Sequence, residues 1–226
     1  MTFSQPQLIR MALRRISAAV VVLSVLLFLP AGTLDYWQAW AYFVTLFVPL
    51  TFVFFYLIRH DPELLERRMR MKEKEPTQSL IIKLGSLCYV LIFLLPGLDR
   101  RFGLSEVPAT FSVLADVCVL LGYALFIRVL RVNSFASRII EVEQEQRVIT
   151  TGPYARVRHP MYSAVLLMFL ATPIALGSWW ALLPALLLVI VIVVRLLDEE
   201  RVLVKELKGY REYMQATRYR LLPFVW

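Results

Sequence analysis

Six apolar runs constrain the fold of this chain more than any other feature of its sequence. They cover residues 16–34, 39–58, 80–95, 109–130, 160–176 and 179–194. A helix needs about 20 mostly apolar residues to cross the roughly 30 Å hydrocarbon core of a bilayer. Hydrophobic residues make up 59% of the 226 residues, whereas soluble domains contain about 45–50% apolar residues. The pattern predicts an all-α, polytopic integral membrane protein with about six transmembrane helices.

The basic residues indicate how these helices are oriented. Lysine and arginine are concentrated in the N-terminal segment, in residues 59–83 and 131–158, and in the C-terminal tail. Cytoplasmic loops of membrane proteins retain such residues, so we expect both termini to be cytoplasmic. Arg100 and Arg101 depart from this rule because they fall in a predicted outer loop. The net charge of +8 then reflects topology, and we expect no nucleic-acid partner.

Cysteine and histidine are too few and too dispersed to predict a metal site. Cys88 and Cys118 lie inside apolar runs, where cysteine behaves as a small hydrophobic residue. The sequence contains no CxxC motif and no closely spaced histidine pair, which are the usual patterns of protein-bound metals. We therefore expect no metal.

The chain divides into two predicted regions. Residues 1–130 form an N-terminal four-helix membrane region, and residues 131–226 contain a polar loop, a helical hairpin and a C-terminal amphipathic helix. We expect Pro96-Gly97 to end the third run and Gly177-Ser178 to form the tight turn of the hairpin. In the C-terminal segment, apolar side chains recur at helical spacing and predict one shared face. They are Leu203, Leu207, Tyr210 and Met214.

A short helix is predicted to begin at Asp61-Pro62, because proline is favoured in the first turn of a helix. Leu64, Leu65 and Met69 would form a narrow apolar stripe, with basic residues on the other face. Such a helix suits an anionic membrane surface. The same residues also fit a solvated basic loop. The basic residues are Arg67, Arg68, Arg70 and Lys72.

The densest polar and aromatic segment, TGPYARVRHPMY at residues 151–162, comes directly before the hairpin. His159 either starts the fifth helix, with Pro160 in its first turn, or acts as a hydrogen-bonding group toward a ligand. Tyr154 and Tyr162 are typical of the membrane interface, and they also suit stacking against an adenine or a cation. A polar ligand and a lipid could meet at this position.

Arg195 and Glu199 close the sixth run and share one helix face, because they are four residues apart. One interpretation is an ion pair at the membrane interface whose arginine reaches toward water. The other is a functional pair, since charges held deeper in the bilayer cost about 2.5–3.5 kcal/mol and mark functional sites. The spacing alone leaves both interpretations open.

In combination, these motifs resemble the isoprenylcysteine carboxyl methyltransferase and phospholipid methyltransferase superfamily. The resemblance covers residues 133–226 and consists of GPYxxVRHPMY, the helical hairpin, RxxxEE, YxxY and RYRLLPF, in this order. It implies an integral membrane methyltransferase that uses S-adenosyl-L-methionine in a cytosol-facing pocket. Its substrate would be a lipophilic small molecule or a lipidated acceptor that enters from the membrane lipids between helices.

The resemblance also implies roles for individual residues. Arg195 matches the substrate-side arginine, and Glu199 matches the acidic residue beside the cofactor; these two are the expected catalytic residues. Tyr210, Tyr213, Arg220 and Pro223 match a closing motif, where we expect structural roles. The positions that match cofactor contacts are Gln146, Arg147, Val148, Ile149, Tyr154, His159, Pro160, Met161, Tyr162 and Glu199. The side chains at 146–149 depart from the family pattern, so we expect backbone contacts there.

The methyl acceptor is the main point that the sequence leaves open. Carboxyl O-methylation of an isoprenylcysteine-like acceptor is our leading prediction, because a guanidinium at position 195 would repel an amine. A phospholipid N-methyltransferase is an alternative. An NADPH-dependent membrane reductase of the sterol type is another, although those enzymes have RHPNY where this chain has Met161. The last alternative is a membrane scaffold without enzymatic activity.

Overall fold

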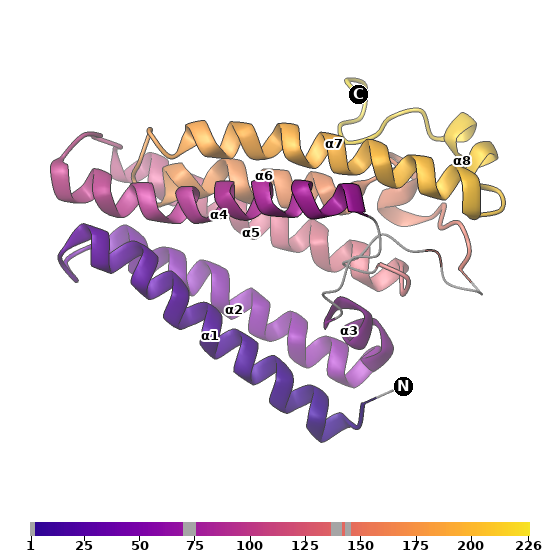
Figure 1. The fold of residues 1–226 in the computed structure, drawn as a ribbon, viewed down its shortest axis with the longest axis horizontal. Coiled ribbons are helices and arrows are strands. Elements are labelled where there is room, and N and C mark those ends of the chain that lie inside the picture. The colour runs from indigo at the N-terminus through magenta and orange to yellow at the C-terminus, as the bar shows by residue number, and fades with distance from the viewer. Residues whose placement is uncertain (1–2, 70–75, 137–141, 143–145) are drawn as a thin grey trace.

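The described part of the protein, residues 3–69, 76–136, 142 and 146–226 of a computed structural model, is helical and contains no strand. Figure 1 shows α1 and α2 as a hairpin beside a bundle of α4, α5, α6 and α7. The all-α class is thereby confirmed. The helices are α1 (Gln5–Ala31), α2 (Trp37–His60), α3 (Pro62–Met69), α4 (Pro76–Phe102), α5 (Ala109–Val132), η1 (Gly152–Ala155), α6 (Pro160–Ala175), α7 (Leu182–Glu206) and α8 (Tyr210–Ala216).

Four of these helices are long and apolar enough to cross a membrane: α1, α2, α5 and the Ile81–Phe102 part of α4. Large apolar side chains such as Val21, Leu29 and Val44 are exposed on them, which suits contact with lipid. The apolar helix α6 has 16 residues, or about 24 Å at 1.5 Å per residue. α7 carries several charges in its C-terminal half. The chain is thus that of an integral membrane protein, and six spans remain a prediction.

Glycines allow the closest approaches between helices. A Cβ atom at Gly122 of α5 would lie 2.4 Å from the Met168 side chain and 3.1 Å from the Ala164 carbonyl oxygen of α6. One at Gly97 of α4 would lie 2.5 Å from the Leu27 carbonyl oxygen of α1. Such distances leave no space for a side chain, so α5 packs directly along α6 and α1 along α4. The predicted boundary between residues 130 and 131 therefore separates α5 from α6, two helices that pack closely against each other.

The prediction that Pro96-Gly97 ends the third run was wrong, because α4 continues to Phe102. Proline removes one backbone hydrogen bond, and membrane helices tolerate it where neighbouring helices compensate. The extra turn carries Asp99, next to Arg100 and Arg101, which were expected in an outer loop. The Asp99 Oδ2 atom accepts hydrogen bonds from the hydroxyls of Ser105 and Ser178, each at 2.5 Å. The turn after α6 is thus joined to the end of α4.

The C-terminal segment does not form one continuous helix. α7 runs to Glu206, and the chain then turns at Gly209, whose φ of 86° lies in the left-handed region that favours glycine. Leu207 and Tyr210 nevertheless pack in one cluster, with Leu203 and Met214 against it. The grouping of apolar residues was therefore predicted correctly, but the helix that was expected to carry it is broken.

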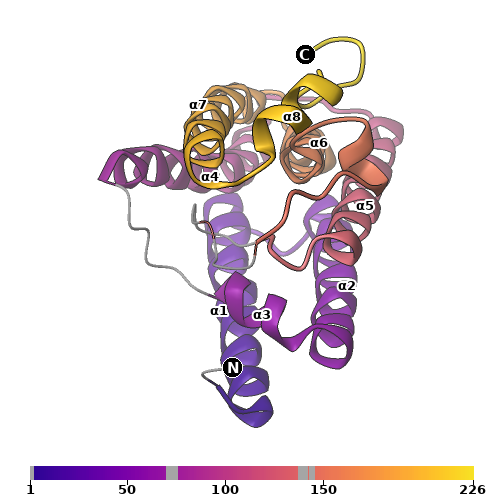
Figure 2. The same cartoon turned by 90° about the vertical axis from the view of Figure 1, so that its right-hand side faces the viewer.

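The short helix α3 begins at Pro62 as predicted, and the Leu64 N–H donates to Asp61 Oδ1 at 2.9 Å. Leu64, Leu65 and Met69 are buried in a cluster that also contains residues of α1 and α2. Residues 62–69 are therefore not a solvated loop. Figure 2 shows α3 between α1 and α2, near the N-terminal end of α1. Arg70 and Lys72 lie outside the described residues.

Candidate active site

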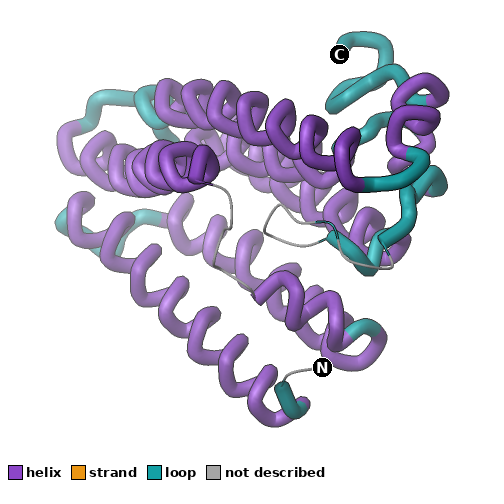
Figure 3. The backbone as a smooth tube through the Cα atoms, turned by 45° about the vertical axis from the view of Figure 1, so that its right-hand side comes forward, coloured by secondary structure: helices purple, strands orange, loops and turns teal. Residues whose placement is uncertain are grey.

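A cavity of about 340 Å³ lies where the polar loop, α6, α7 and α8 meet. Figure 3 shows the loop before α6, the connection from α7 to α8 and the C-terminal tail at the same end of the helices. The structure brings nearly all of the predicted site residues to this cavity, and Pro160 is the only one that does not line it. Those that do are Gln146, Arg147, Val148, Ile149, Tyr154, His159, Met161, Tyr162, Arg195 and Glu199.

The start of α6 is fixed by the C-terminal tail. His159 is the N-cap residue and Pro160 occupies the first turn, which agrees with one of the two interpretations of His159. The backbone N–H groups of Arg158 and His159 donate to the carbonyl oxygens of Tyr219 and Arg220, both at 2.9 Å. These bonds satisfy backbone donors just before the helix. Pro160 is buried and helps to start the helix, so its place is structural.

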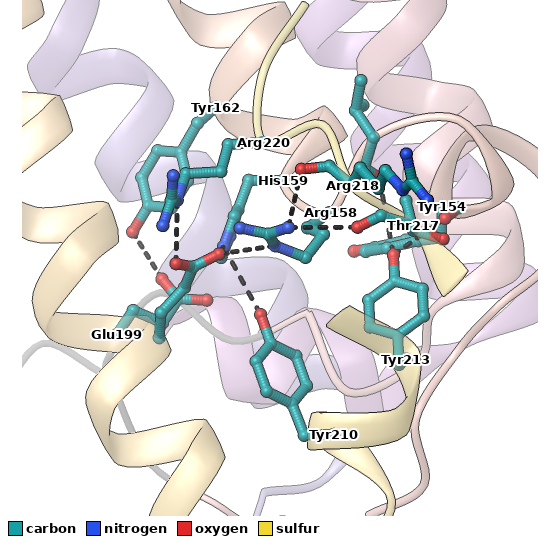
Figure 4. Close-up of polar contacts among 12 residues, drawn as sticks. Tyr154, Arg158, His159, Tyr162, Glu199, Tyr210, Tyr213, Thr217, Arg218 and Arg220 are labelled. Atoms are coloured by element: carbon teal, nitrogen blue, oxygen red, sulfur yellow. Dashed lines mark hydrogen bonds and ion pairs between the residues drawn. The ribbon is translucent and has the colours of Figure 1, made fainter. Parts of the chain in front are cut away.

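Glu200, which was not among the predicted site residues, is held by three side chains near the cavity. Its Oε1 atom accepts from Arg158 Nε at 2.7 Å and lies 3.2 Å from His159 Nε2, and its Oε2 accepts from Arg220 Nε at 2.9 Å. Figure 4 shows Arg158, His159 and Arg220 close together. Burial by itself would raise the pKa of Glu200, but the hydrogen bonds from His159, Arg158 and Arg220 lower it to about 2. The carboxylate is thus held ionised.

The sequence contains a signal for these partners of Glu200. Glu199 and Glu200 are consecutive on a helix and point about 100° apart, given 3.6 residues per turn. If one faces the cavity, the other must find a different partner. A buried carboxylate requires cations or hydrogen-bond donors. Arg158 belongs to the GPYxxVRHPMY motif and Arg220 to the RYRLLPF motif. Arg220 was expected to have a structural role, and its hydrogen bond to Glu200 is a contact of that kind.

Tyr162 connects the two residues predicted to be catalytic. Its hydroxyl donates to Glu199 Oε2 at 2.6 Å and accepts from Arg195 Nε at 3.2 Å. All three side chains line the cavity. The arrangement favours the functional interpretation of Arg195 and Glu199 over an interfacial anchor, because both residues border an internal space.

Tyr154 forms the wall toward the loop. Its hydroxyl accepts from Asn133 Nδ2 at 2.7 Å, and its carbonyl accepts from the Tyr213 hydroxyl at 2.8 Å. Burial raises the pKa of Tyr154 to about 12; the charge on Glu199 acts in the same direction, while the Asn133 hydrogen bond and the charge on Arg68 oppose it. Tyr154 is therefore a neutral hydrogen-bonding and stacking group at ordinary pH.

Several lining residues were not predicted. Asn133, Phe135 and Ala136 follow α5, and Arg68 reaches the cavity from α3. The signal for Arg68 was weak, because it belongs to a run of basic residues that resembles any cytoplasmic loop. α3 nevertheless places its side chain at the cavity, so the N-terminal region contributes directly to the site.

Comparison with known proteins gives one family match that spans most of this site. The model of the phospholipid methyltransferase family matches residues 110–209. The match covers 100 of the 226 residues and makes this region similar to that family. The match confirms the resemblance to the integral membrane methyltransferases and indicates a methyltransferase that acts on a lipid-related substrate. Phospholipid methyltransferases use S-adenosylmethionine as the methyl donor.

A search of curated proteins found none that matches the chain. The phospholipid methyltransferase match includes every residue that was predicted to bind cofactor or substrate. Arg68 and Arg220 lie outside it. The family match therefore spans the positions of the predicted ligands, and the structure adds Arg68 and Arg220 from outside it.

Proposed function

We propose that this chain transfers a methyl group from S-adenosylmethionine to the carboxylate of a lipophilic acceptor of the isoprenylcysteine type. The observation that carries the proposal is the placement of Arg195 and Glu199, joined through the Tyr162 hydroxyl, on the wall of one cavity. A cation and an anion are thus available side by side, one for each of two ligands.

The residues of the cavity fit the cofactor. Glu199 offers a carboxylate for the cofactor's ammonium group, and the Tyr154 ring offers a stacking surface for the adenine. Residues 146–149 add backbone donors and acceptors, of which adenine needs only a few. The cavity volume of about 340 Å³ falls within the range of small-molecule sites, about 300–1,000 Å³. His159 borders the same space, but its Nε2 lies beside Glu200, so we assign it to positioning.

Arg195 would orient the acceptor. A guanidinium binds a carboxylate through two parallel hydrogen bonds, which fixes the direction of the carboxylate oxygens. S-adenosylmethionine, when bound, supplies a sulfonium methyl group that a carboxylate can take without a proton transfer, the sulfur keeping the bonding pair as a neutral thioether. The protein then has to align two ligands and exclude water, and alignment of this kind contributes a large part of catalysis.

A phospholipid amine is the second candidate acceptor, and the family match is the observation that favours it. The guanidinium of Arg195 weighs against an amine as the reacting group, because like charges repel. We place the cavity on the cytosolic side, with both termini, because the basic segments flank it.

A methyl-transfer assay with labelled S-adenosylmethionine tests the proposal. A prenylated cysteine should accept a methyl group that base treatment releases, because esters hydrolyse in base, whereas an N-methylated phospholipid keeps its label. Arg195→Ala and Glu199→Ala should each lower kcat/KM by about 100-fold, the order expected when alignment is lost. Arg201→Ala, an exposed arginine on the same helix, is the control. Full activity in both variants would overturn the assigned roles.

A further inference from the structure

Residues 221–226, which we call the tail loop, expose large apolar side chains at the cavity end of the helices. Leu222, Phe224 and Val225 are 57%, 88% and 75% exposed. Single apolar side chains are common on protein surfaces, but neighbouring ones that are exposed together mark an interaction site. The tail loop therefore predicts a partner outside the chain.

The tail loop is an ordered turn whose backbone is largely paired within itself. The N–H groups of Leu221 and Leu222 donate to the main-chain oxygen of Trp226 at 2.9 and 3.1 Å. The N–H groups of Val225 and Trp226 donate to the Leu222 carbonyl, each at 3.2 Å. Pro223 has no N–H group. Unpaired backbone donors are costly in a medium of low polarity, and this pairing removes most of that cost.

Phe224 occupies an unfavourable backbone conformation. Its φ of 66° lies in the left-handed region, which disfavours residues with a Cβ atom. The centre of its ring lies 5.5 Å from that of Tyr219, yet most of the ring stays exposed. Strain of this kind is found where a contact or a function maintains it. The conformation thus presents an apolar ring at the surface at the expense of backbone energy.

Hydrogen bonds place the tail loop beside the start of α6. The Arg220 carbonyl accepts from the His159 N–H at 2.9 Å, and the Leu221 carbonyl accepts from the hydroxyl of Ser163, in the first turn of α6, at 2.6 Å. The chain therefore advances along α6, an apolar helix. Figure 1 shows the tail turned back from α8 toward the middle of the helices, and Figures 1 and 2 show it on the side away from α1 and α2.

The neighbouring helix α7 presents an apolar face toward the bilayer. Leu187, Ile190 and Val194 are exposed on it, and their spacing places them on one side of the helix. This face suits lipid contact and extends toward the cavity end. An apolar loop at this end of α6 and α7 therefore lies where lipid is the nearest apolar partner.

The residues around the tail loop are those of a bilayer interface. Tyr219 and Trp226 combine an aromatic ring with a polar group, and such residues are enriched where headgroups meet acyl chains. The Arg220 guanidinium carbon lies 5.0 Å from the centre of the Trp226 ring, and Arg218 is exposed. Arginines beside aromatic and aliphatic side chains are typical of segments that lie in the interface.

We propose that the tail loop inserts Leu222, Phe224 and Val225 into the interfacial region of the bilayer leaflet at the cavity end. The partner is lipid, and the proposal does not depend on the reaction that the cavity supports. Arg220, which precedes the loop, donates to Glu200 at 2.9 Å. Lipid contact at the loop would thereby hold the candidate site at the membrane surface.

The experiment attaches the environment-sensitive fluorophore nitrobenzoxadiazole to a cysteine at Val225. The full chain, with Cys88→Ala and Cys118→Ala, is reconstituted into phosphatidylcholine nanodiscs that each hold one copy. Gln215→Cys, exposed on α8, is the control in water, and Val21→Cys, exposed on the spanning helix α1, is the control in lipid. Phospholipids with a nitroxide on the acyl chain and aqueous iodide serve as the two quenchers.

We expect the probe at Val225 to be quenched by the labelled lipid, like the probe at Val21. Its quenching by iodide should be about tenfold or more weaker than at Gln215, the order expected from burial of one large apolar side chain. Phe224→Asn in the Val225→Cys background should abolish the difference from Gln215. Asparagine adopts the left-handed conformation more readily than phenylalanine, so this variant removes the ring without disfavouring the turn. Phe224→Trp should retain the lipid contact.

Each possible result decides the proposal. Lipid quenching at Val225 that is lost in Phe224→Asn and kept in Phe224→Trp supports insertion through the ring. Equal iodide quenching at Val225 and Gln215 would overturn the proposal, because the loop would then lie in water. Protection from both quenchers would also overturn it, by placing the loop against protein. Unchanged lipid quenching in Phe224→Asn would contradict the role of Phe224.

Discussion

Two buried carboxylates, Glu200 and Asp99, lie at opposite ends of the α6–α7 hairpin, and the protein satisfies them by different means. Glu200 is 5% exposed and is held by two arginines and a histidine beside the cavity. Asp99 is 2% exposed, accepts hydrogen bonds from two serine hydroxyls, and its Oδ1 has no partner among the described residues.

The difference indicates what each end contributes. At the cavity end, charged groups from α6, α7 and the C-terminal tail meet at Glu200, so this carboxylate fixes the positions of Arg158 and His159 next to the site. At the turn end, Asp99 joins α4 to the turn through neutral hydroxyls and has no connection to the cavity. One carboxylate holds residues beside the candidate site, and the other joins two parts of the fold.

The largest effect is expected from Glu200→Gln. Removing one member of a buried ion network leaves the other charges uncompensated and costs about 3–5 kcal/mol. Unfolding in mixed detergent micelles measures the free energy of unfolding. Glu206→Gln, at an exposed position on the same helix, should change it by no more than about 0.5 kcal/mol. Equal effects of the two substitutions would contradict the role of Glu200 in the ion network.

Acid should weaken the cavity end through the same carboxylate. The pKa of Glu200 is lowered from 4.5 to about 2 in the folded protein, so its ionised form stabilises the fold. That contribution is complete above about pH 5 and is lost as the pH falls toward about 2. Thermal unfolding of wild type and Glu200→Gln across this window should give converging stabilities at low pH. A constant difference between them would contradict the assignment.

Asp99→Asn should have a smaller effect, about 1.5–3 kcal/mol, because it weakens hydrogen bonds to a charged group without leaving a cation unpaired. The affinity for S-adenosylhomocysteine should stay the same, since Asp99 lies at the other end of the hairpin. The same unfolding assay and calorimetry measure both quantities. A loss of cofactor affinity would show that the two ends are coupled.

The smallest predicted effect concerns one neutral hydroxyl group at the cavity end, that of Tyr213. Tyr213→Phe removes the hydroxyl that donates to the Tyr154 carbonyl at 2.8 Å and should cost about 1 kcal/mol of stability. The detergent unfolding assay can resolve a change of this size. A cost above that of Asp99→Asn would reverse the order expected here.

The sequence allowed a good prediction of the helices, because apolar runs and prolines are local signals. The prediction failed at Pro96, because α4 continues past this proline to Phe102, and at Gly209, where a left-handed residue interrupts a periodic apolar pattern. The grouping of Tyr154, His159, Tyr162, Arg195 and Glu199 around one cavity was anticipated from ordered motifs. Their functions as cofactor and substrate ligands remain predictions.

The sequence could not reveal contacts between distant segments. The pairing of Glu200 with Arg158 and Arg220 depends on the tail folding back onto the start of α6. The approach of Arg68 to Met161 depends on how α3 sits against α5 and α6. Such contacts are set by tertiary packing, and no spacing rule within one helix describes them.

Calorimetric binding of S-adenosylhomocysteine to the purified protein, with NADPH as the comparison ligand, tests the central claim most directly. We predict a dissociation constant on the order of micromolar for S-adenosylhomocysteine, a large loss of this affinity in a folded Glu199→Gln variant, and no binding of NADPH. Binding of NADPH without S-adenosylhomocysteine would contradict the methyltransferase assignment and would favour a membrane reductase instead.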